Sequence, residues 1–127
     1  MSVLSSSGLT LVRLMGDMPR GPRREGVFAL WLTLRVAEDV FLLPPPAERA
    51  MRRRVTALEQ RLSSLSLPAP LRRALVTALA ELREPLRAQS ALALQQLVAP
   101  TREVLGAEAG DALGKAARTA AQKARNE

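Results

Sequence analysis

The sequence predicts an all-α protein, a small irregular bundle of about four to five helices with proline breaks. Two observations predict this fold class. Apolar residues recur at helical spacing over long stretches, and prolines and glycines divide the chain between those stretches. A chain of 127 residues fits one domain. At that length, folding buries roughly two-thirds of the surface that the unfolded chain exposes.

The N-terminal segment, residues 1–25, combines a short apolar stretch with a basic loop. Residues 5–18 mix helical spacing with alternation, and a short helix is slightly favoured over a strand. Residues 18–26 contain two prolines, two glycines and three arginines, so neither helix nor strand is expected there.

A helical core is predicted for residues 26–100, and it begins with an apolar helix over residues 26–43. Arg35, Glu38 and Asp39 share one narrow face, and apolar side chains cover most of the rest. We therefore expect this helix to be buried nearly all round. The alternative is an N-terminal β-hairpin plus helices, with strands at residues 9–15 and 27–36, because the second run has good β propensity.

The clearest helical pattern covers residues 46–65, after a triple proline. The pattern is a heptad seam of apolar residues: Met51, Val55, Leu58, Leu62 and Leu65. In a coiled coil of two chains, Arg54 could pair with Glu59 of a parallel neighbour. Only about two and a half heptads are present, so packing against another helix of the same chain is favoured.

The next apolar stripe, residues 71–98, contains Pro85, where one helix must kink or a second helix must start. The last segment, residues 101–127, is predicted to be an Ala/Gly-rich helix or tail that begins with Thr101 as a helix cap. Gly106, Gly110 and Gly114 recur every four residues, which on a helix makes a groove for close helix packing. A frayed tail of marginal helicity is the alternative.

The composition argues against several kinds of catalytic site. The chain has no His, Cys or Tyr, so it lacks the commonest general base, thiolate nucleophiles, and imidazole and thiolate metal ligands. The adjacent acids Glu38 and Asp39 point about 100° apart on a helix, so they should not share a proton as a catalytic pair does. We predict no catalytic residue, no cofactor and no metal site.

The net charge is +7, from 19 Lys and Arg against 12 Asp and Glu, and it favours an anionic partner surface. Arginine forks suit carboxylates and phosphates. The candidate partner-binding residues are the arginines of the loop and of the heptad helix, with three apolar residues of the preceding helix: Arg20, Arg23, Arg24, Arg49, Arg52, Arg53, Trp31, Phe41 and Leu42.

These observations lead to two functional hypotheses. The leading one is a non-catalytic helical accessory subunit that docks on a larger protein assembly, in one version on the cytoplasmic face of a membrane complex near anionic lipid. The rival is an architectural nucleic-acid-binding protein that contacts phosphates through its arginine clusters. The aromatic residues fall on the helix predicted to be buried, so no stacking platform for bases is expected.

No apolar run approaches the roughly 20 residues of a membrane-spanning helix. A secretory signal is not expected either, because the first 12 residues contain no Lys or Arg and are rich in Ser and Gly. We therefore expect a cytoplasmic protein, either free or peripheral on the inner membrane face. The sequence gives no oligomeric state.

Overall fold

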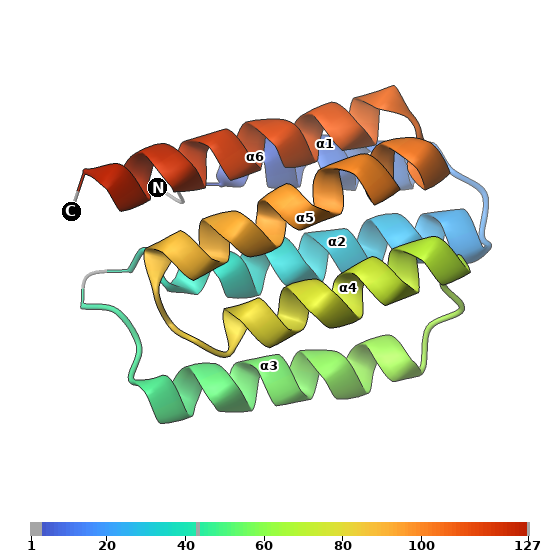
Figure 1. Cartoon of the computed structure of the whole chain (residues 1–127). Helices are drawn as coiled ribbons and strands as arrows, with labels where there is room; N and C mark the ends of the chain where they lie inside the picture. Colours follow the sequence, from blue (N-terminus) through green and yellow to red (C-terminus); the bar gives the residue numbers. More distant parts are fainter. Residues whose placement is uncertain (1–3, 43, 127) are drawn as a thin grey trace.

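The computed structural model describes residues 4–42 and 44–126, and these residues form six helices and no strand (Figure 1). The all-α prediction is therefore confirmed, and the β-hairpin alternative is wrong. The helices number six and not four to five, because both the N-terminal and the C-terminal segments are full helices and residues 71–98 contain a break. The elements in chain order are α1 (Ser5–Gly16), α2 (Pro22–Asp39), α3 (Glu48–Ser63), α4 (Ala69–Leu82), α5 (Arg87–Leu105) and α6 (Ala107–Arg125).

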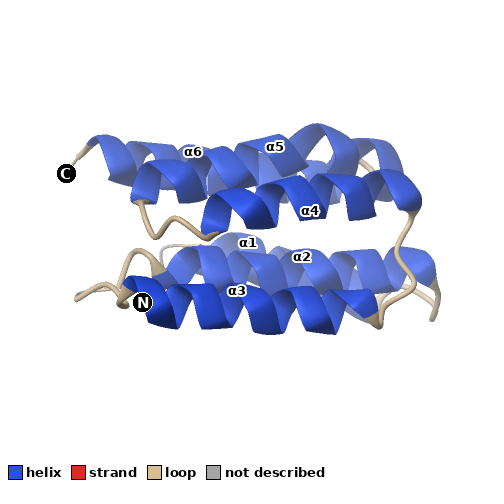
Figure 2. Cartoon of the chain, turned by 60° about the horizontal axis from the view of Figure 1, so that its bottom comes forward, coloured by secondary structure: helices blue, strands red, loops and turns tan. Residues whose placement is uncertain are grey.

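The helices pack as two layers of three (Figure 2). One layer contains α1, α2 and α3 side by side, and the other contains α6, α5 and α4. Helix α1 contacts α6, α2 contacts α5, and α3 contacts α4 across the interface between the layers. The chain therefore completes one layer, crosses over after α3 and returns helix by helix above it. Short connections make sequential helices antiparallel neighbours.

The basic loop is shorter than the sequence predicted, because α2 begins at Pro22. Proline suits the first turn of a helix, where its missing N–H has no intrahelical partner anyway and its fixed φ is already helical. Glu25 in this first turn also accepts a hydrogen bond of 2.9 Å from the Ser66 backbone N–H. Arg23 and Arg24 thus belong to a helix and not to a loop.

Pro85 separates α4 from α5, which resolves the predicted kink into two helices. Helix α5 then continues through Pro100 and ends at Leu105, so Thr101 is buried within α5 and does not cap a later helix. Both of the boundaries predicted between segments, after residues 25 and 100, fall inside helices.

Helix α6 packs on α5 over the most extensive helix contact of the fold. At Gly110, an added Cβ would lie 2.7 Å from Arg102 Cβ and 3.0 Å from Arg102 Cα, so this glycine permits the close approach of the two helices. At Gly114, an added Cβ would meet only the end of the Arg118 side chain, at 3.3 Å. Gly106 is not part of this face, since it forms the turn between the helices with φ 100° and ψ 175°.

The heptad residues of α3 face the interior of the same chain. Met51, Val55, Leu58 and Leu62 are buried, while Leu65 lies just beyond the helix end and is partly buried. Arg54 and Glu59 pair with neighbouring helices of the chain and not with each other. Arg54 Nη1 lies 2.8 Å from Asp39 Oδ2 on α2, and Arg83 Nη2 on α4 lies 2.7 Å from Glu59 Oε1.

One buried hydrogen bond ties the two layers together. Ser90 Oγ on α5 donates to the Ala37 carbonyl oxygen near the end of α2 at 2.9 Å. That carbonyl belongs to the last turn of α2, where carbonyl oxygens have no regular N–H partner within the helix. Within residues 4–42 and 44–126, none of the helices is long and apolar enough to cross a bilayer.

Candidate functional site

Helix α2 carries two different faces. Its inner face is buried against the second layer by small and aliphatic residues: Gly26, Val27, Ala29, Leu30, Thr33, Leu34 and Ala37. Its outer face is only partly covered, and it contains Phe28, Trp31 and Arg35, followed by Glu38 and Asp39. These residues follow one another at three or four positions, which places them on one stripe of the helix. The prediction that this helix is buried nearly all round is therefore wrong along this stripe.

The outer stripe of α2 is the floor of a groove between α1 and α3, with a volume of about 920 Å³. We call it the outer groove. Its wall on α1 is apolar, because Leu9 and Val12 are 70% and 43% exposed. Its wall on α3 contains Arg54, Ala57 and Arg61. The outer groove thus joins an apolar wall, an aromatic floor and a cationic wall.

Two arginines cover the aromatic floor. The rings of Phe28 and Trp31 stack with centroids 6.1 Å apart and planes inclined by 21°. Arg35 Cζ lies 5.0 Å from the centroid of the Trp31 ring, and Arg61 Cζ lies 5.6 Å from that of Phe28. Such cation–π contacts are each worth about 0.5–1 kcal/mol at exposed sites. They hold two exposed guanidinium groups over the floor of the groove.

The acidic residues of the groove lie at the end of α2. Asp39 is engaged by Arg54 in the ion pair described above. Burial raises the pKa of Glu38, and the neighbouring Asp39 charge raises it further, while Arg35 and a hydrogen bond from the Leu4 backbone act in the opposite direction. The groove is therefore cationic along α3 and over the aromatic rings, and it is closer to neutral near Asp39.

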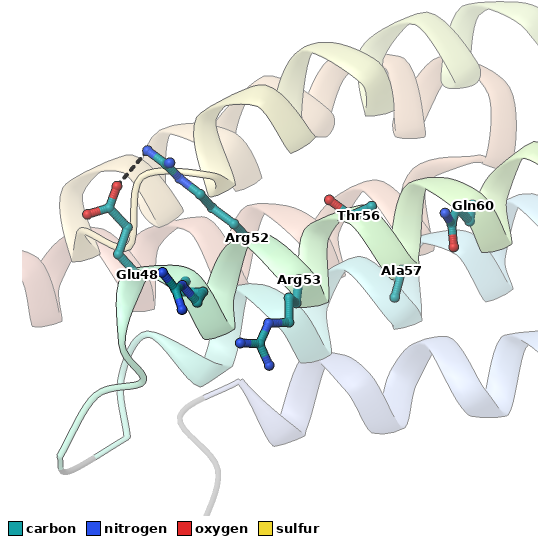
Figure 3. Close-up of a pocket in the computed structure, with 7 residues that line it drawn as sticks. Glu48, Arg52, Arg53, Thr56, Ala57 and Gln60 are labelled. Atoms are coloured by element: carbon teal, nitrogen blue, oxygen red, sulfur yellow. Dashed lines mark ion pairs between the residues drawn. The ribbon is translucent and has the colours of Figure 1, made fainter.

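The arginine cluster at the start of α3 forms a second, shallower surface of about 640 Å³ (Figure 3). All of its lining residues belong to α3, so it is one face of a single helix and not a cleft between elements. Arg52 Nη2 pairs with Glu48 Oε1 at 2.5 Å, whereas Arg53 and Ala57 point toward the opposite edge of this face. Ala57 lines both surfaces, which makes the arginine cluster continuous with the outer groove.

The arginines predicted to bind a partner do not gather at one place. Arg20 precedes α2 and Arg23 and Arg24 lie in its first turn, whereas the α3 cluster follows the far end of α2 (Figure 1). Helix α2 has 18 residues, so the two clusters are separated by about 27 Å of helix. They form two basic patches and not one.

The three apolar candidates also differ in position. Trp31 lies in the floor of the outer groove. Phe41 is buried in the core, with Arg87 Cζ 5.4 Å from its ring centroid, and it does not line the outer groove. Leu42 is 49% exposed beyond the end of α2, outside the outer groove.

Sequence reasoning missed five residues on which the character of the outer groove depends: Leu9, Val12, Phe28, Arg35 and Arg61. The α2 side of the groove could have been recognised in the sequence, because Phe28 and Trp31 lie on the same helical face as Arg35 and Glu38. A face that begins with aromatic residues and continues with charges is typical of a partly exposed stripe. The contribution of α1 had no local signal, since it depends on which helix flanks α2.

Among the described residues, no group of three acidic side chains is close enough to hold a metal ion. No protein-family model, no curated protein and no solved structure matches the chain. The interpretation of the site therefore rests on its own geometry.

Proposed function

We propose that the protein is a non-catalytic helical accessory subunit that docks on a larger protein assembly through the outer groove. The observation that carries the proposal is the groove itself, in which exposed Leu9 and Val12 adjoin the partly exposed Phe28 and Trp31. Single exposed apolar residues are ordinary on a protein surface, but a contiguous apolar patch with a polar rim is typical of an interaction site. Aromatic residues and arginine are also the residue types enriched at binding hot spots.

The non-catalytic part of the proposal is supported by composition and by the acidic pair. The chain contains no His, Cys or Tyr. Of the two adjacent acids, Asp39 is held in an ion pair by Arg54, while Glu38 lies at the preceding position of the helix. Such an arrangement supports a role in charge balance better than a role in proton transfer.

Quantitative affinity purification from native cells tests this proposal with a matched pair of variants. Leu9→Ser and Val76→Ser each remove an exposed apolar side chain, 70% exposed on α1 and 63% exposed on α4, but only Leu9 lines the outer groove. We expect Leu9→Ser to deplete the co-purified assembly and Val76→Ser to leave it at the wild-type level. Equal recovery with both variants would count against docking through this groove.

The membrane version of the proposal is supported by the exposed Arg49 and Arg53, which have no carboxylate within 4.0 Å among the described residues. Arginines near an anionic membrane surface contribute about 1 kcal/mol each. Flotation with vesicles that contain anionic lipid tests it, and we expect an Arg49→Gln/Arg53→Gln variant to float less than the wild type. Wild-type protein that stays unbound at low salt would contradict this version.

A further inference from the structure

The outer groove has the length and the walls of a receptor site for one helix. Its floor follows α2 from Phe28 to Asp39, which at 1.5 Å per residue is about 17 Å, or about three helical turns. Helices α1 and α3 form its two sides. Grooves of this kind bind amphipathic helices through apolar residues that recur every three or four positions.

The apolar requirement for an occupant comes from α1 and α2. Leu9 and Val12 are three positions apart on α1 and both face the groove, opposite the stacked rings of Phe28 and Trp31. An apolar stripe placed between these surfaces would cover the most exposed large apolar side chain of the described residues, Leu9.

The charge requirement comes from α2 and α3. Arg35 and Arg61 lie over the rings of the floor, and neither has a carboxylate within 4.0 Å among the residues that the structure describes. Arg53 extends the cationic wall along α3, and the small side chain of Ala57 leaves space between Arg53 and Arg61. Carboxylates along one edge of an occupant would therefore meet guanidinium groups that form no close ion pair within the described residues, although Arg35 acts on Glu38 at longer range.

We propose that the outer groove binds an acidic amphipathic helix of about three turns, with its apolar stripe between Leu9, Val12 and Trp31 and its carboxylates against Arg35 and Arg61. This inference rests on the proposed docking function and adds the chemistry of the partner. The exposed charges of Arg35 and Arg61 would discriminate among partners and speed association more than they add affinity.

Two other occupants fit the groove less well. A second copy of the chain carries the same charge of +7, so pairing would bring cationic surfaces together. Nucleic acid would stack its bases on ring faces, but the guanidinium groups of Arg35 and Arg61 lie over the rings of Trp31 and Phe28. The apolar wall on α1 also offers nothing to a phosphate backbone.

Trp31 provides the test, because it is the only tryptophan of the chain and it lies in the floor of the groove. Three helical peptides without Trp or Tyr share one apolar stripe and carry Glu, Lys or Gln at the edge positions. We expect the Glu peptide to shift the emission of Trp31 to the blue and to bind at least about tenfold more tightly than the Lys peptide, since two rim charges contribute together about 1.4 kcal/mol.

A charge reversal makes the test specific. In Arg35→Glu/Arg61→Glu, the preference should invert, so that the Lys peptide binds more tightly than the Glu peptide. The matched control, Arg73→Glu/Arg125→Glu, changes the net charge equally on exposed positions of α4 and α6, and it should keep the wild-type preference. Circular dichroism checks that each variant keeps its helices.

The contradictory outcomes separate this inference from the docking proposal. Equal binding of the three peptides would overturn the acidic partner and leave docking through the groove in place. A Trp31 response to single-stranded DNA that exceeds the response to the Glu peptide would overturn it in favour of nucleic acid. A shift in emission with the concentration of the protein alone would overturn it in favour of a second copy of the chain. No response to any peptide would overturn the inference, while the affinity purification with Leu9→Ser would still decide the docking function.

Discussion

At the residue scale, two glycines four positions apart on α6 differ in what the fold requires of them. Gly110 meets backbone and Cβ of Arg102 on α5, whereas Gly114 has only the flexible end of Arg118 nearby. Sequence spacing alone treats the two positions as equivalent. The distinction arises from packing, because Gly110 lies against Arg102 near the end of α5, whereas no atom of α5 lies within 4 Å of an added Cβ at Gly114.

This difference predicts opposite effects of the same substitution. Gly110→Ala should lower the free energy of unfolding by about 1–3 kcal/mol, because the helices must separate to admit the new Cβ. Gly114→Ala should raise it by up to about 1 kcal/mol, since alanine favours the helix and displaces only a mobile side chain. Urea unfolding of both variants measures the effect. Equal destabilisation would contradict the close contact assigned to Gly110.

Glu38 provides a prediction about pH. Burial raises the pKa of its carboxyl group in the folded chain. The folded state therefore holds the proton more tightly than the unfolded state, and stability is lost as the pH rises from the unfolded pKa through the raised one. Glu38→Gln carries no charge at any pH, so it should be more stable than the wild type near pH 7, with this advantage absent near pH 3.5.

Urea unfolding of the two proteins at both pH values checks this prediction. Glu25→Gln is unsuitable as a control because Glu25 accepts a hydrogen bond from Ser66. Glu103→Gln, on an exposed position of α5, is a better control and should show a smaller pH-dependent difference. A larger advantage of Glu38→Gln at low pH than at neutral pH would reverse the sign and refute the argument.

At the scale of elements, the position of Trp31 on the outer stripe of α2 predicts how iodide and caesium ions quench its fluorescence. Trp31 is partly exposed beneath the cationic Arg35. Iodide should therefore reach it more readily than caesium, because surface potentials concentrate ions of the opposite sign. Relative to free N-acetyltryptophanamide, we expect the ratio of iodide to caesium quenching to be at least about twofold higher at low salt, where screening is weakest.

The same measurement has an internal control. Arg35→Glu/Arg61→Glu should lower the ratio of iodide to caesium quenching below that of the free indole, whereas Arg73→Glu/Arg125→Glu should leave it nearly unchanged. A ratio that is insensitive to Arg35 and Arg61 would mean that the groove is not cationic in solution.

Some features of the helices could be predicted from the sequence, and the positions of some helix ends could not. The seam on α3 was predictable because Met51, Val55, Leu58 and Leu62 repeat at one spacing, and these residues are buried. The start of α2 at Pro22 was missed, because proline was interpreted as a helix breaker although it suits a first turn. The continuation of α5 through Pro100 was missed for a related reason, since packing against α4 and α6 maintains a helix that local preference would end.

At the scale of the whole molecule, the candidate site is a product of the arrangement of the helices. The outer groove needs α1 and α3 on either side of α2, and no local pattern specifies that order. The arginine clusters that stood out in the sequence prove to lie near opposite ends of α2, whereas Arg35 and Arg61, which stand alone in the sequence, are brought together over the aromatic pair.

The central claim is that the outer groove is the surface through which the protein contacts its assembly. Photo-crosslinking in native cells tests it most directly, with the crosslinking amino acid at position 9 in the groove or at position 76 on α4, two positions of similar exposure. We predict one dominant adduct from position 9, which an additional Trp31→Ala substitution weakens, and no such adduct from position 76. The same adducts from both positions, or an adduct from position 76 alone, would contradict the claim.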